Sequence, residues 1–295
     1  MKYNRIIHGD VIKNSMNLEK ESIQTIITSP PYFGLRKYGK SLSEKESEIG
    51  REKEVDSYIN HLVQVFEHLK PALKKDGIVW VNLGDSYVKG NLQGVPWRFA
   101  IAMQNKGWIL RSDIIWHKPN AMPSSVKNRP TTDHEYIFMF TLSEKNYFYD
   151  ADAIREEHVT FTEKSKMKGG RNHLGKKGGT PENGKNAGNS NLHDGRWDQA
   201  FHPLGRNKRT VWSIPLGKYK GAHFAVFPEK LVETCLLAAT KEGDTVLDPF
   251  FGSGTTGVVA LKHNRNYIGI ELVEDYVKLA TERLKNCMPQ LELFK

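Results

Sequence analysis

The chain has 295 residues, of which 38% are hydrophobic, and its 43 Lys and Arg outnumber its 34 Asp and Glu by nine. This length and apolar content suffice for a large folded core, and the excess of positive charge favours a polyanionic partner. No apolar run approaches the roughly 20 residues that span a bilayer, and the N-terminus lacks a signal-peptide core. Only Cys235 and Cys287 are available for disulfides. We therefore expect a cytoplasmic protein and exclude membrane and secreted classes.

Short apolar runs bounded by Gly, Pro or Asp recur along the chain and predict buried strands. They lie at residues 5–10, 25–31, 77–85, 110–119, 135–141, 245–250 and 266–272. Segments with helical spacing of apolar residues lie between or after them, at 55–73, 228–240, 256–264 and 273–286. Strands that alternate with helices predict an α/β fold with a doubly wound, mostly parallel, seven-stranded Rossmann-like sheet.

Two consecutive prolines end the second predicted strand, in the sequence TSPPY at 28–32. Proline fixes φ and restricts the residue before it, so Ser29, Pro30 and Pro31 must leave the strand as a stiff turn. Such a turn either only ends the strand or forms part of a functional site. The polar run at 39–54 that follows it fits a mobile cover over a site and a solvated loop equally well.

A basic segment from about residue 154 to 209 breaks the pattern of strands and helices. It is rich in Gly, Asn, Lys and Arg, and between Arg155 and Arg209 it carries twelve Lys plus Arg against six Asp plus Glu. A long stretch without core-facing periodicity is either disordered or an insertion that orders on a ligand. Its charge suits a nucleic-acid backbone, and a solvated linker is the alternative.

The run TVLDPFFGSGTTGVVALKHN at 245–264 predicts a strand, a glycine turn and a helix. Gly252 and Gly254 would let a ligand approach the backbone, and the following helix N-terminus offers unpaired amide donors. No Gly-Lys-Ser/Thr follows, which excludes a phosphate-binding P-loop. Glu271 ends the next strand near the spacing of a ribose ligand, and Asp10 ends the first strand in the same manner. The alternatives are a strand-end charge for Glu271 and a helix N-cap for Asp10.

Three motifs resemble those of the β-class DNA amino-methyltransferases, which methylate the exocyclic nitrogen of cytosine or adenine. TSPPY at 28–32 resembles their catalytic motif, HFAVFPEKLVE at 223–233 the preceding cofactor motif, and DPFFGSGTT at 248–256 the S-adenosylmethionine motif. The order of the motifs also resembles the β-class permutation. This implies a catalytic part at 1–150, a target-recognition insertion at 151–212 that binds DNA, and a cofactor-binding part at 213–295.

The resemblance implies a role for each matching residue. Ser29 and Pro30, held by Pro31, would accept hydrogen bonds from the target amine, and Tyr32 would stack on the flipped base. The cofactor-binding residues that it implies are Asp10 at the adenine, Glu271 at the ribose, and Thr28, Phe224, Phe227, Asp248, Phe250, Gly252, Ser253, Gly254 and Thr255. Candidates for DNA contact are Lys168, Arg171, Arg196, Arg206, Lys208 and Arg209.

Other positions remain open at this stage. The bulky Phe251 departs from the family pattern and leaves its pocket contact undecided. Trp116 and Lys118 end a strand on the same face, where contact with the base or DNA and simple sheet-end packing are equally compatible with the sequence. No histidine has metal-ligand spacing, so we expect no metal.

The serine of TSPPY favours cytosine N4 as the target, since family members with Asp-Pro-Pro-Tyr usually methylate adenine N6, although both side chains accept from either amine. Methylation of cytosine carbon 5 would need a cysteine in a Pro-Cys turn, whereas both cysteines lie in helical patterns. RNA and protein methyltransferases usually carry the glycine motif first, and a non-catalytic relative would lose a motif. We expect a site-specific cytosine-N4 methyltransferase of double-stranded DNA, with S-adenosylhomocysteine as product. The sequence leaves a paired restriction endonuclease and a homodimer open.

Overall fold

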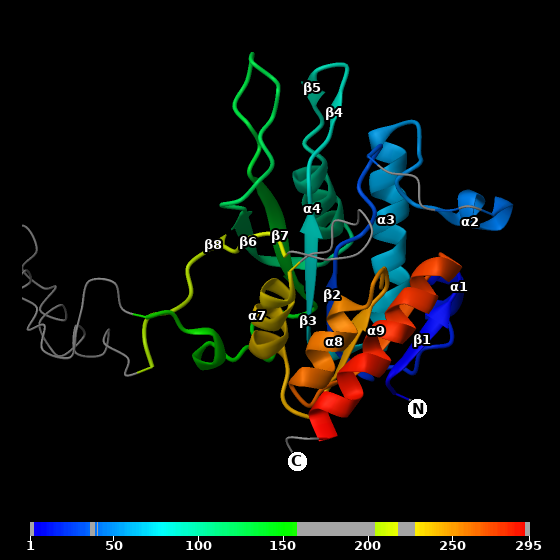
Figure 1. Cartoon of the computed structure of the whole chain (residues 1–295), viewed down its shortest axis with the longest axis vertical. Coiled ribbons are helices and arrows are strands. Elements are labelled where there is room, and N and C mark those ends of the chain that lie inside the picture. The colour runs from blue at the N-terminus through cyan, green and yellow to red at the C-terminus, as the bar shows by residue number, and fades with distance from the viewer. Residues whose placement is uncertain (1–2, 36–38, 40, 158–203, 218–227, 293–295) are drawn as a thin grey trace, which may run out of the picture. The chain divides into compact units, whose positions relative to one another are not determined.

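The structure is a computed structural model that describes residues 3–35, 39, 41–157, 204–217 and 228–292 (Figure 1). The chain divides into two compact units, one made of residues 1–150 and 209–295 and the other of residues 151–208. Within the described part of the second unit, a short 3₁₀ helix, Asp152–Ile154, precedes an isolated bridge between Glu156 and Arg206.

The first unit contains a sheet that has eight strands in the described ranges, in the order β1-β10-β9-β2-β3-β7-β6-β8. The strands are β1 (Arg5–His8), β2 (Ile23–Thr28), β3 (Leu73–Leu83), β6 (Ile109–His117), β7 (His134–Thr141), β8 (Val211–Ser213), β9 (Thr245–Asp248) and β10 (Asn266–Glu271). Strand β7 pairs antiparallel with β3 and β6, and the other pairings are parallel. The predicted α/β class with a mostly parallel sheet is confirmed.

The predicted number of seven strands was too low by one. Each of the seven predicted runs contains a strand, and β8 was missed because its three residues, VWS, follow the basic segment and are too short to show a period. Strand β8 pairs with β6 at the sheet edge, and its Trp212 is 4% exposed against Trp80 of β3. The buried side chain of Trp212 therefore helps to hold β8 against the sheet, although the sequence of β8 is too short to show a periodic pattern.

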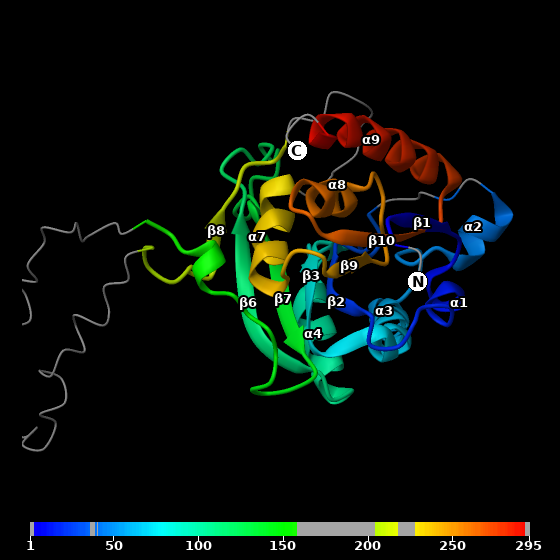
Figure 2. The ribbon, with the colours of Figure 1, turned by 90° about the horizontal axis from the view of Figure 1, so that it is seen from below.

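Helices cover both faces of the sheet (Figure 2). One face carries α1 (Val11–Ser15), α3 (Val55–Leu69) and α4 (Val95–Asn105), and the other carries α7 (Glu229–Ala239), α8 (Thr255–Lys262) and α9 (Glu274–Glu292). Helix α3 connects β2 to β3 on one face, whereas α8 connects β9 to β10 on the other. The strand order therefore reverses between β9 and β2, which makes their carboxyl ends the expected place for a ligand.

The remaining elements of the first unit are short. They are α2 (Leu42–Ser47), the 3₁₀ helix Lys70–Ala72, and the hairpin of β4 (Tyr87–Val88) and β5 (Asn91–Leu92). Helix α2 begins with a capping box, in which the Ser41 hydroxyl accepts from the Glu44 amide and the Glu44 carboxylate accepts from the Ser41 amide. The hairpin projects beyond the carboxyl end of β3, as Figure 1 shows.

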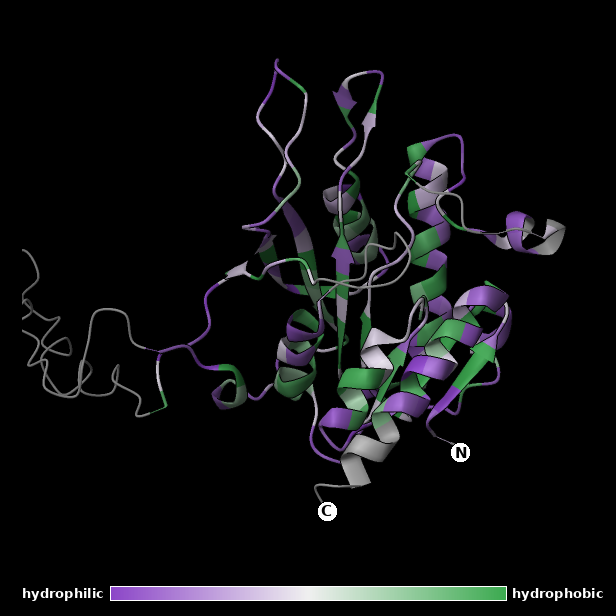
Figure 3. Ribbon diagram, viewed as in Figure 1, coloured by the Kyte–Doolittle hydropathy of each residue, from purple (hydrophilic) through white to green (hydrophobic). Residues whose placement is uncertain are grey.

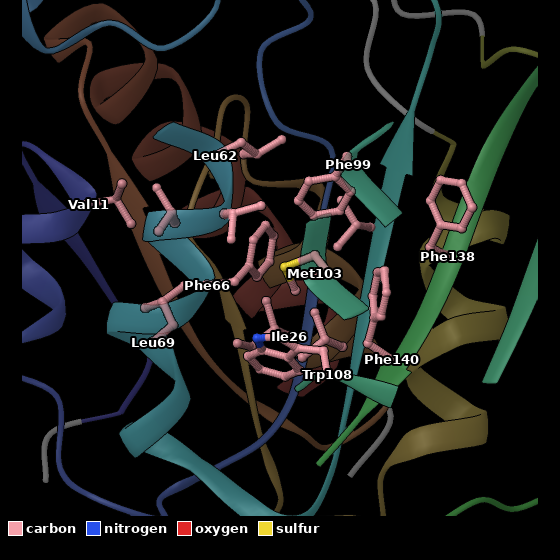
Figure 4. Packing of buried hydrophobic residues seen from close by; sticks show 14 of the residues in the cluster. Val11, Ile26, Leu62, Phe66, Leu69, Phe99, Met103, Trp108, Phe138 and Phe140 are labelled. Atoms are coloured by element: carbon pink, nitrogen blue, oxygen red, sulfur yellow. The ribbon is translucent and has the colours of Figure 1, made fainter. Parts of the chain in front are cut away.

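The core lies between the sheet and the helices that flank it, and hydrophobic residues are concentrated there (Figure 3). The apolar stripe predicted for α3 is buried, with Tyr58, Leu62, Val65, Phe66 and Leu69 all fully inaccessible. Figure 4 shows part of this stripe packed beside α4 and β7. The rings of Phe66 and Phe99 lie 5.5 Å apart, so α3 and α4 pack against each other on this face of the sheet.

Candidate active site

A cavity of about 430 Å³ lies at the carboxyl ends of β1, β2, β9 and β10. Predicted site residues that line it are Asp10, Ser29, Pro30, Pro31, Tyr32, Phe250, Gly252, Ser253, Thr255 and Glu271. Thr28 and Asp248 end β2 and β9, Gly254 lies in the glycine turn, and these three do not line the cavity. The turn after β2 and the turn after β9, about 220 residues apart in sequence, thus line one cavity.

Some predicted site residues lie outside the part of the chain that the structure describes. These are Phe224 and Phe227 of the HFAVFPEK motif, and Lys168, Arg171 and Arg196 of the basic segment. Their assignments stay predictions.

The glycine turn is held by backbone conformation and by Glu271. Gly252 has φ +52° and Gly254 has φ +79°, a region in which an L-residue with a side chain is strained. The Gly252 amide donates to Glu271 Oε2 at 2.7 Å, and the Val273 amide donates to Oε1 at 2.8 Å. Burial raises the pKa of Glu271, which is 8% exposed. Both oxygens of this carboxylate face the loops that line the cavity.

Asp248 joins the two turns to each other. Its Oδ1 accepts from Thr28 Oγ1 at 2.7 Å and from the Phe250 amide at 3.1 Å, and its Oδ2 accepts from Thr256 Oγ1 at 2.7 Å. Burial raises the pKa of Asp248 to about 7, although these hydrogen bonds favour the ionised form. Thr28 and Asp248 thus do not line the cavity, but their hydrogen bonds hold together the two turns that do.

Arg283 of α9 is a residue at this turn that the sequence did not single out. Its Nη1 donates to Ser253 Oγ at 3.2 Å and to Thr255 Oγ1 at 2.9 Å, and its Nη2 donates to Glu229 Oε1 of α7 at 2.9 Å. It links the glycine turn to the two helices beside it. An Arg within an amphipathic helix carries no signal of this role, because most such residues are solvated.

The Phe251 side chain, whose contact the sequence left open, packs mainly behind the glycine turn. Its ring is 3% exposed, stacks on Tyr267 with centroids 5.6 Å apart, and covers the backbone of Gly269. A Cβ at position 269 would overlap this ring, and one at Gly257 would lie 2.8 Å from its Cζ. Two glycines therefore make room for the bulky residue.

We predict that Gly269→Ala lowers the free energy of unfolding by about 1–3 kcal/mol, because the new methyl group overpacks the ring of Phe251. Urea unfolding measures the change. Phe251→Leu should cost less in the Gly269→Ala background than in the wild type, since the smaller side chain relieves the overlap. Equal costs in both backgrounds would show that the two residues are not coupled.

The TSPPY turn is fixed from both ends. Thr28 is tied to Asp248, and the Tyr58 hydroxyl of α3 donates to the Pro31 carbonyl at 2.9 Å. Burial raises the pKa of Tyr58 far above its ordinary value, so its hydroxyl remains a donor at neutral pH. The turn is consequently rigid through tertiary contacts as well as through its prolines.

Tyr32 takes part in a buried polar network. Its hydroxyl donates to Glu135 Oε2 of β7 at 2.5 Å and accepts from Asn82 Nδ2 of β3 at 2.9 Å, and it lies 3.3 Å from Ser29 Oγ. Lys118 Nζ forms an ion pair with Glu135 Oε1. Burial first, and then the charge of Glu135, raise the pKa of Tyr32 well above its ordinary value.

Asn82 and Glu135 are cavity-lining residues that sequence reasoning missed. Each lies at the end of a strand at this edge of the sheet, but neither belongs to a recognisable spacing, because β3 and β7 bring together residues 53 positions apart. Lys118, left open above, faces this cavity and pairs with Glu135. Trp116 is 2% exposed and donates from Nε1 to the Ile214 carbonyl at 2.7 Å, so most of its surface serves sheet-end packing.

Asp10 combines a structural contact with a place in the cavity wall. Its Oδ1 accepts from the Lys13 amide at 2.9 Å, which makes it the N-cap of α1. It also lines the cavity. Asp10 is therefore a helix N-cap, as one of its two predicted roles required. Its carboxylate still has acceptor positions for a ligand.

The described candidates for DNA contact differ in their surroundings. Within the second unit, Arg206 and Lys208 pair with Glu156, at 3.2 and 3.1 Å. Arg209 belongs to the first unit and is exposed. Among the described residues, no group of three His, Cys, Asp or Glu side chains could hold a metal ion, and none of the helices there is long and apolar enough to cross a membrane.

Comparison with known proteins identifies the family of the chain. Residues 23–282 match the N6/N4 family model described as DNA methylase. The type II methyltransferase M.Cfr9I of Citrobacter freundii is 40% identical over 95% of this chain and 87% of its own length. The fold resembles that of the PvuII DNA methyltransferase (cytosine-N4-specific), with a TM-score of 0.67, 20% identity, and 99% and 93% of the two chains covered. The chain belongs to the N6/N4 DNA methylase family.

Proposed function

We propose that the protein transfers a methyl group from S-adenosylmethionine to the exocyclic N4 of a cytosine that is flipped out of duplex DNA. One observation carries this proposal: the TSPPY turn and the glycine turn line a single cavity and are joined behind it by Thr28 and Asp248. An acceptor turn for an amine and a binding turn for the methyl donor are the two parts that such a reaction needs.

The chemistry of the glycine turn fits S-adenosylmethionine. Gly252 and Gly254 leave the backbone open to close approach, and the N-terminus of α8 offers amide donors to a carboxylate. The two oxygens of Glu271 accept from the Gly252 and Val273 amides, and a carboxylate has further acceptor positions for the ribose hydroxyls. Asp10 would accept from the adenine amino group. When bound, S-adenosylmethionine supplies the electrophilic methyl group, and S-adenosylhomocysteine is the product.

The TSPPY turn suits the other reactant. The lone pair of an exocyclic amine is delocalised into the base, so the enzyme must accept hydrogen bonds from its N–H groups and hold it in line with the methyl group. The Ser29 hydroxyl and the Pro30 carbonyl are the proposed acceptors, and Pro31, held by Tyr58, keeps them in place. The half-buried ring of Tyr32 would stack on the flipped base, which offsets part of the few kcal/mol that flipping costs.

Ser29 of the TSPPY motif favours cytosine as the target base. Adenine is the alternative target within this family. We propose further that the segment 151–212 is the target-recognition region and binds the DNA backbone through its basic residues. Because M.Cfr9I is named a type II methyltransferase, we also propose that this protein works beside a restriction endonuclease.

The experiment that tests the proposal is incubation of the protein with S-adenosylmethionine labelled in the methyl group and with plasmid DNA, followed by digestion to nucleosides. Label in N4-methylcytosine is expected. Label in N6-methyladenine would replace the proposed base but keep the reaction class, and unlabelled DNA would overturn the proposed function.

A further inference from the structure

The Ser29 hydroxyl needs a partner that decides whether it donates or accepts. A hydroxyl can do both, whereas the proposed reaction requires the Ser29 oxygen to accept from the target amine. If Ser29 kept its hydrogen directed into the cavity, it would oppose an N–H group instead of binding it. The following inference rests on the proposed function and concerns what fixes this direction.

The starting point is the carboxylate of Glu135, whose side chain is 14% exposed. It is paired with the Lys118 ammonium, and an ionised carboxylate can only accept hydrogen bonds. Tyr32 keeps its one hydrogen because burial and the nearby charge raise its pKa. At 2.5 Å from Oε2, the Tyr32 hydroxyl must therefore donate to Glu135.

The direction of this bond determines the next one. Since the hydrogen of Tyr32 is used on Glu135, its oxygen can only accept in the 3.3 Å contact with Ser29 Oγ. Ser29 consequently directs its own hydrogen toward Tyr32, and lone-pair density of its oxygen remains for the cavity that both residues line. The chain of hydrogen bonds runs in one direction, from Ser29 to Tyr32 to Glu135.

Asn82 supports the same arrangement. Its Nδ2 lies 2.7 Å from Glu135 Oε2, 2.9 Å from Tyr32 Oη and 3.3 Å from Ser29 Oγ, all of which can accept. Turning the amide over would place its oxygen against the Glu135 carboxylate, which would bring two acceptors together. Asn82 is 2% exposed, so bulk water competes little for its amide hydrogens.

We propose that Glu135 is a positioning residue that makes the Ser29 hydroxyl an acceptor, acting through the Tyr32 hydroxyl. In this arrangement Glu135 acts on the amine through Tyr32 and Ser29. Its effect on the reaction passes entirely through one hydrogen bond, which gives the proposal a specific test.

The first variant is Glu135→Gln, which keeps the shape of the side chain but offers Tyr32 both a donor and an acceptor. We expect kcat for DNA methylation to fall by about 10- to 100-fold, the equivalent of one charge-assisted hydrogen bond. Because the glycine turn is untouched, the KM for S-adenosylmethionine and the calorimetric Kd for S-adenosylhomocysteine should not change. Glu21→Gln, in an exposed pair with Lys75, is the matched control and should behave as the wild type.

The second variant, Tyr32→Phe, keeps the ring and leaves Glu135 bonded to Asn82 and Lys118. It should lower kcat to a similar extent, and adding Glu135→Gln to it should cost little more, because the link is already broken. Wild-type turnover in Tyr32→Phe would overturn the proposal even if Glu135→Gln did not fold. A full, additive loss in the double variant would also overturn it, since Glu135 would then act by another route.

The wild-type protein in the same assay separates this inference from the proposed function. If the wild type leaves DNA unlabelled, the proposed function fails and this inference fails with it. If the wild type methylates DNA and both single variants are fully active, only the role of Glu135 is overturned.

Discussion

Ser29→Ala is expected to lower the turnover number for DNA methylation by about 10²- to 10³-fold, the usual cost of removing one preorganised hydrogen-bonding group at a reacting centre. The amine nitrogen gains positive charge as it is methylated, so an acceptor aimed at its N–H groups stabilises the transition state more than the ground state. Alanine removes that acceptor and leaves the Pro30 carbonyl as the remaining one.

The binding of S-adenosylhomocysteine distinguishes loss of this acceptor from a general disturbance. The glycine turn is held by Glu271, Asp248 and Arg283, and Thr28 Oγ1, not Ser29, makes the hydrogen bond to Asp248. Calorimetry should therefore give the wild-type Kd in Ser29→Ala. Ser22→Ala, at a partly buried serine that precedes β2 and lies outside the cavity, is a suitable control for the substitution itself. Full turnover in Ser29→Ala would contradict the assigned role of the hydroxyl.

The parts of the fold that sequence could predict are those in which several neighbouring residues carry one signal. The seven predicted strands are short apolar runs, most of them with Gly, Pro, Asp or Glu at or near their ends, and the buried stripe of α3 follows a regular helical period. The two turns of the site were found for the same reason, since prolines at 30 and 31 restrict the backbone and glycines at 252 and 254 free it at neighbouring positions.

The supporting residues of the site were not predictable in this way. Asn82, Glu135 and Arg283 are each isolated in the sequence, at the end of a strand or within a helix, and their partners lie between 17 and 103 positions away. A single polar residue has the same local appearance whether it is solvated or buried. Only the register of β3 with β7 brings Asn82 and Glu135 together at the cavity, and only the packing of α9 on α8 brings Arg283 to the glycine turn.

A further large effect is expected for the pH dependence of stability at Asp248. Its pKa of about 7 in the folded protein lies above the ordinary value of about 3.9 for the unfolded chain. Between these two values the folded protein holds a proton that the unfolded chain has released. The contribution of Asp248 to stability is therefore fully present below about pH 4 and is lost as the pH rises to about 7.

The difference between these two pKa values corresponds to a loss of at most roughly 4 kcal/mol in the free energy of unfolding as the pH rises. Asp248→Asn should abolish this pH-dependent loss. Urea unfolding of both proteins at several values between pH 4 and pH 8 gives the free energy of unfolding of each. The wild type should lose stability relative to Asp248→Asn as the pH rises across this range. Asp56→Asn, at an exposed aspartate that pairs with Arg98, should follow the wild type, and parallel curves for Asp248→Asn and the wild type would refute the assignment.

The asparagine variant also separates the charge of residue 248 from its geometry. The asparagine oxygen can still accept from Thr28 and from the Phe250 amide, while its amide group can donate to the Thr256 hydroxyl, which accepts as readily as it donates. The two turns should thus remain joined in this variant. If Asp248→Asn is more stable than the wild type above pH 7 and still binds S-adenosylhomocysteine, residue 248 contributes to the cavity through these hydrogen bonds, and its negative charge is a cost that the fold bears.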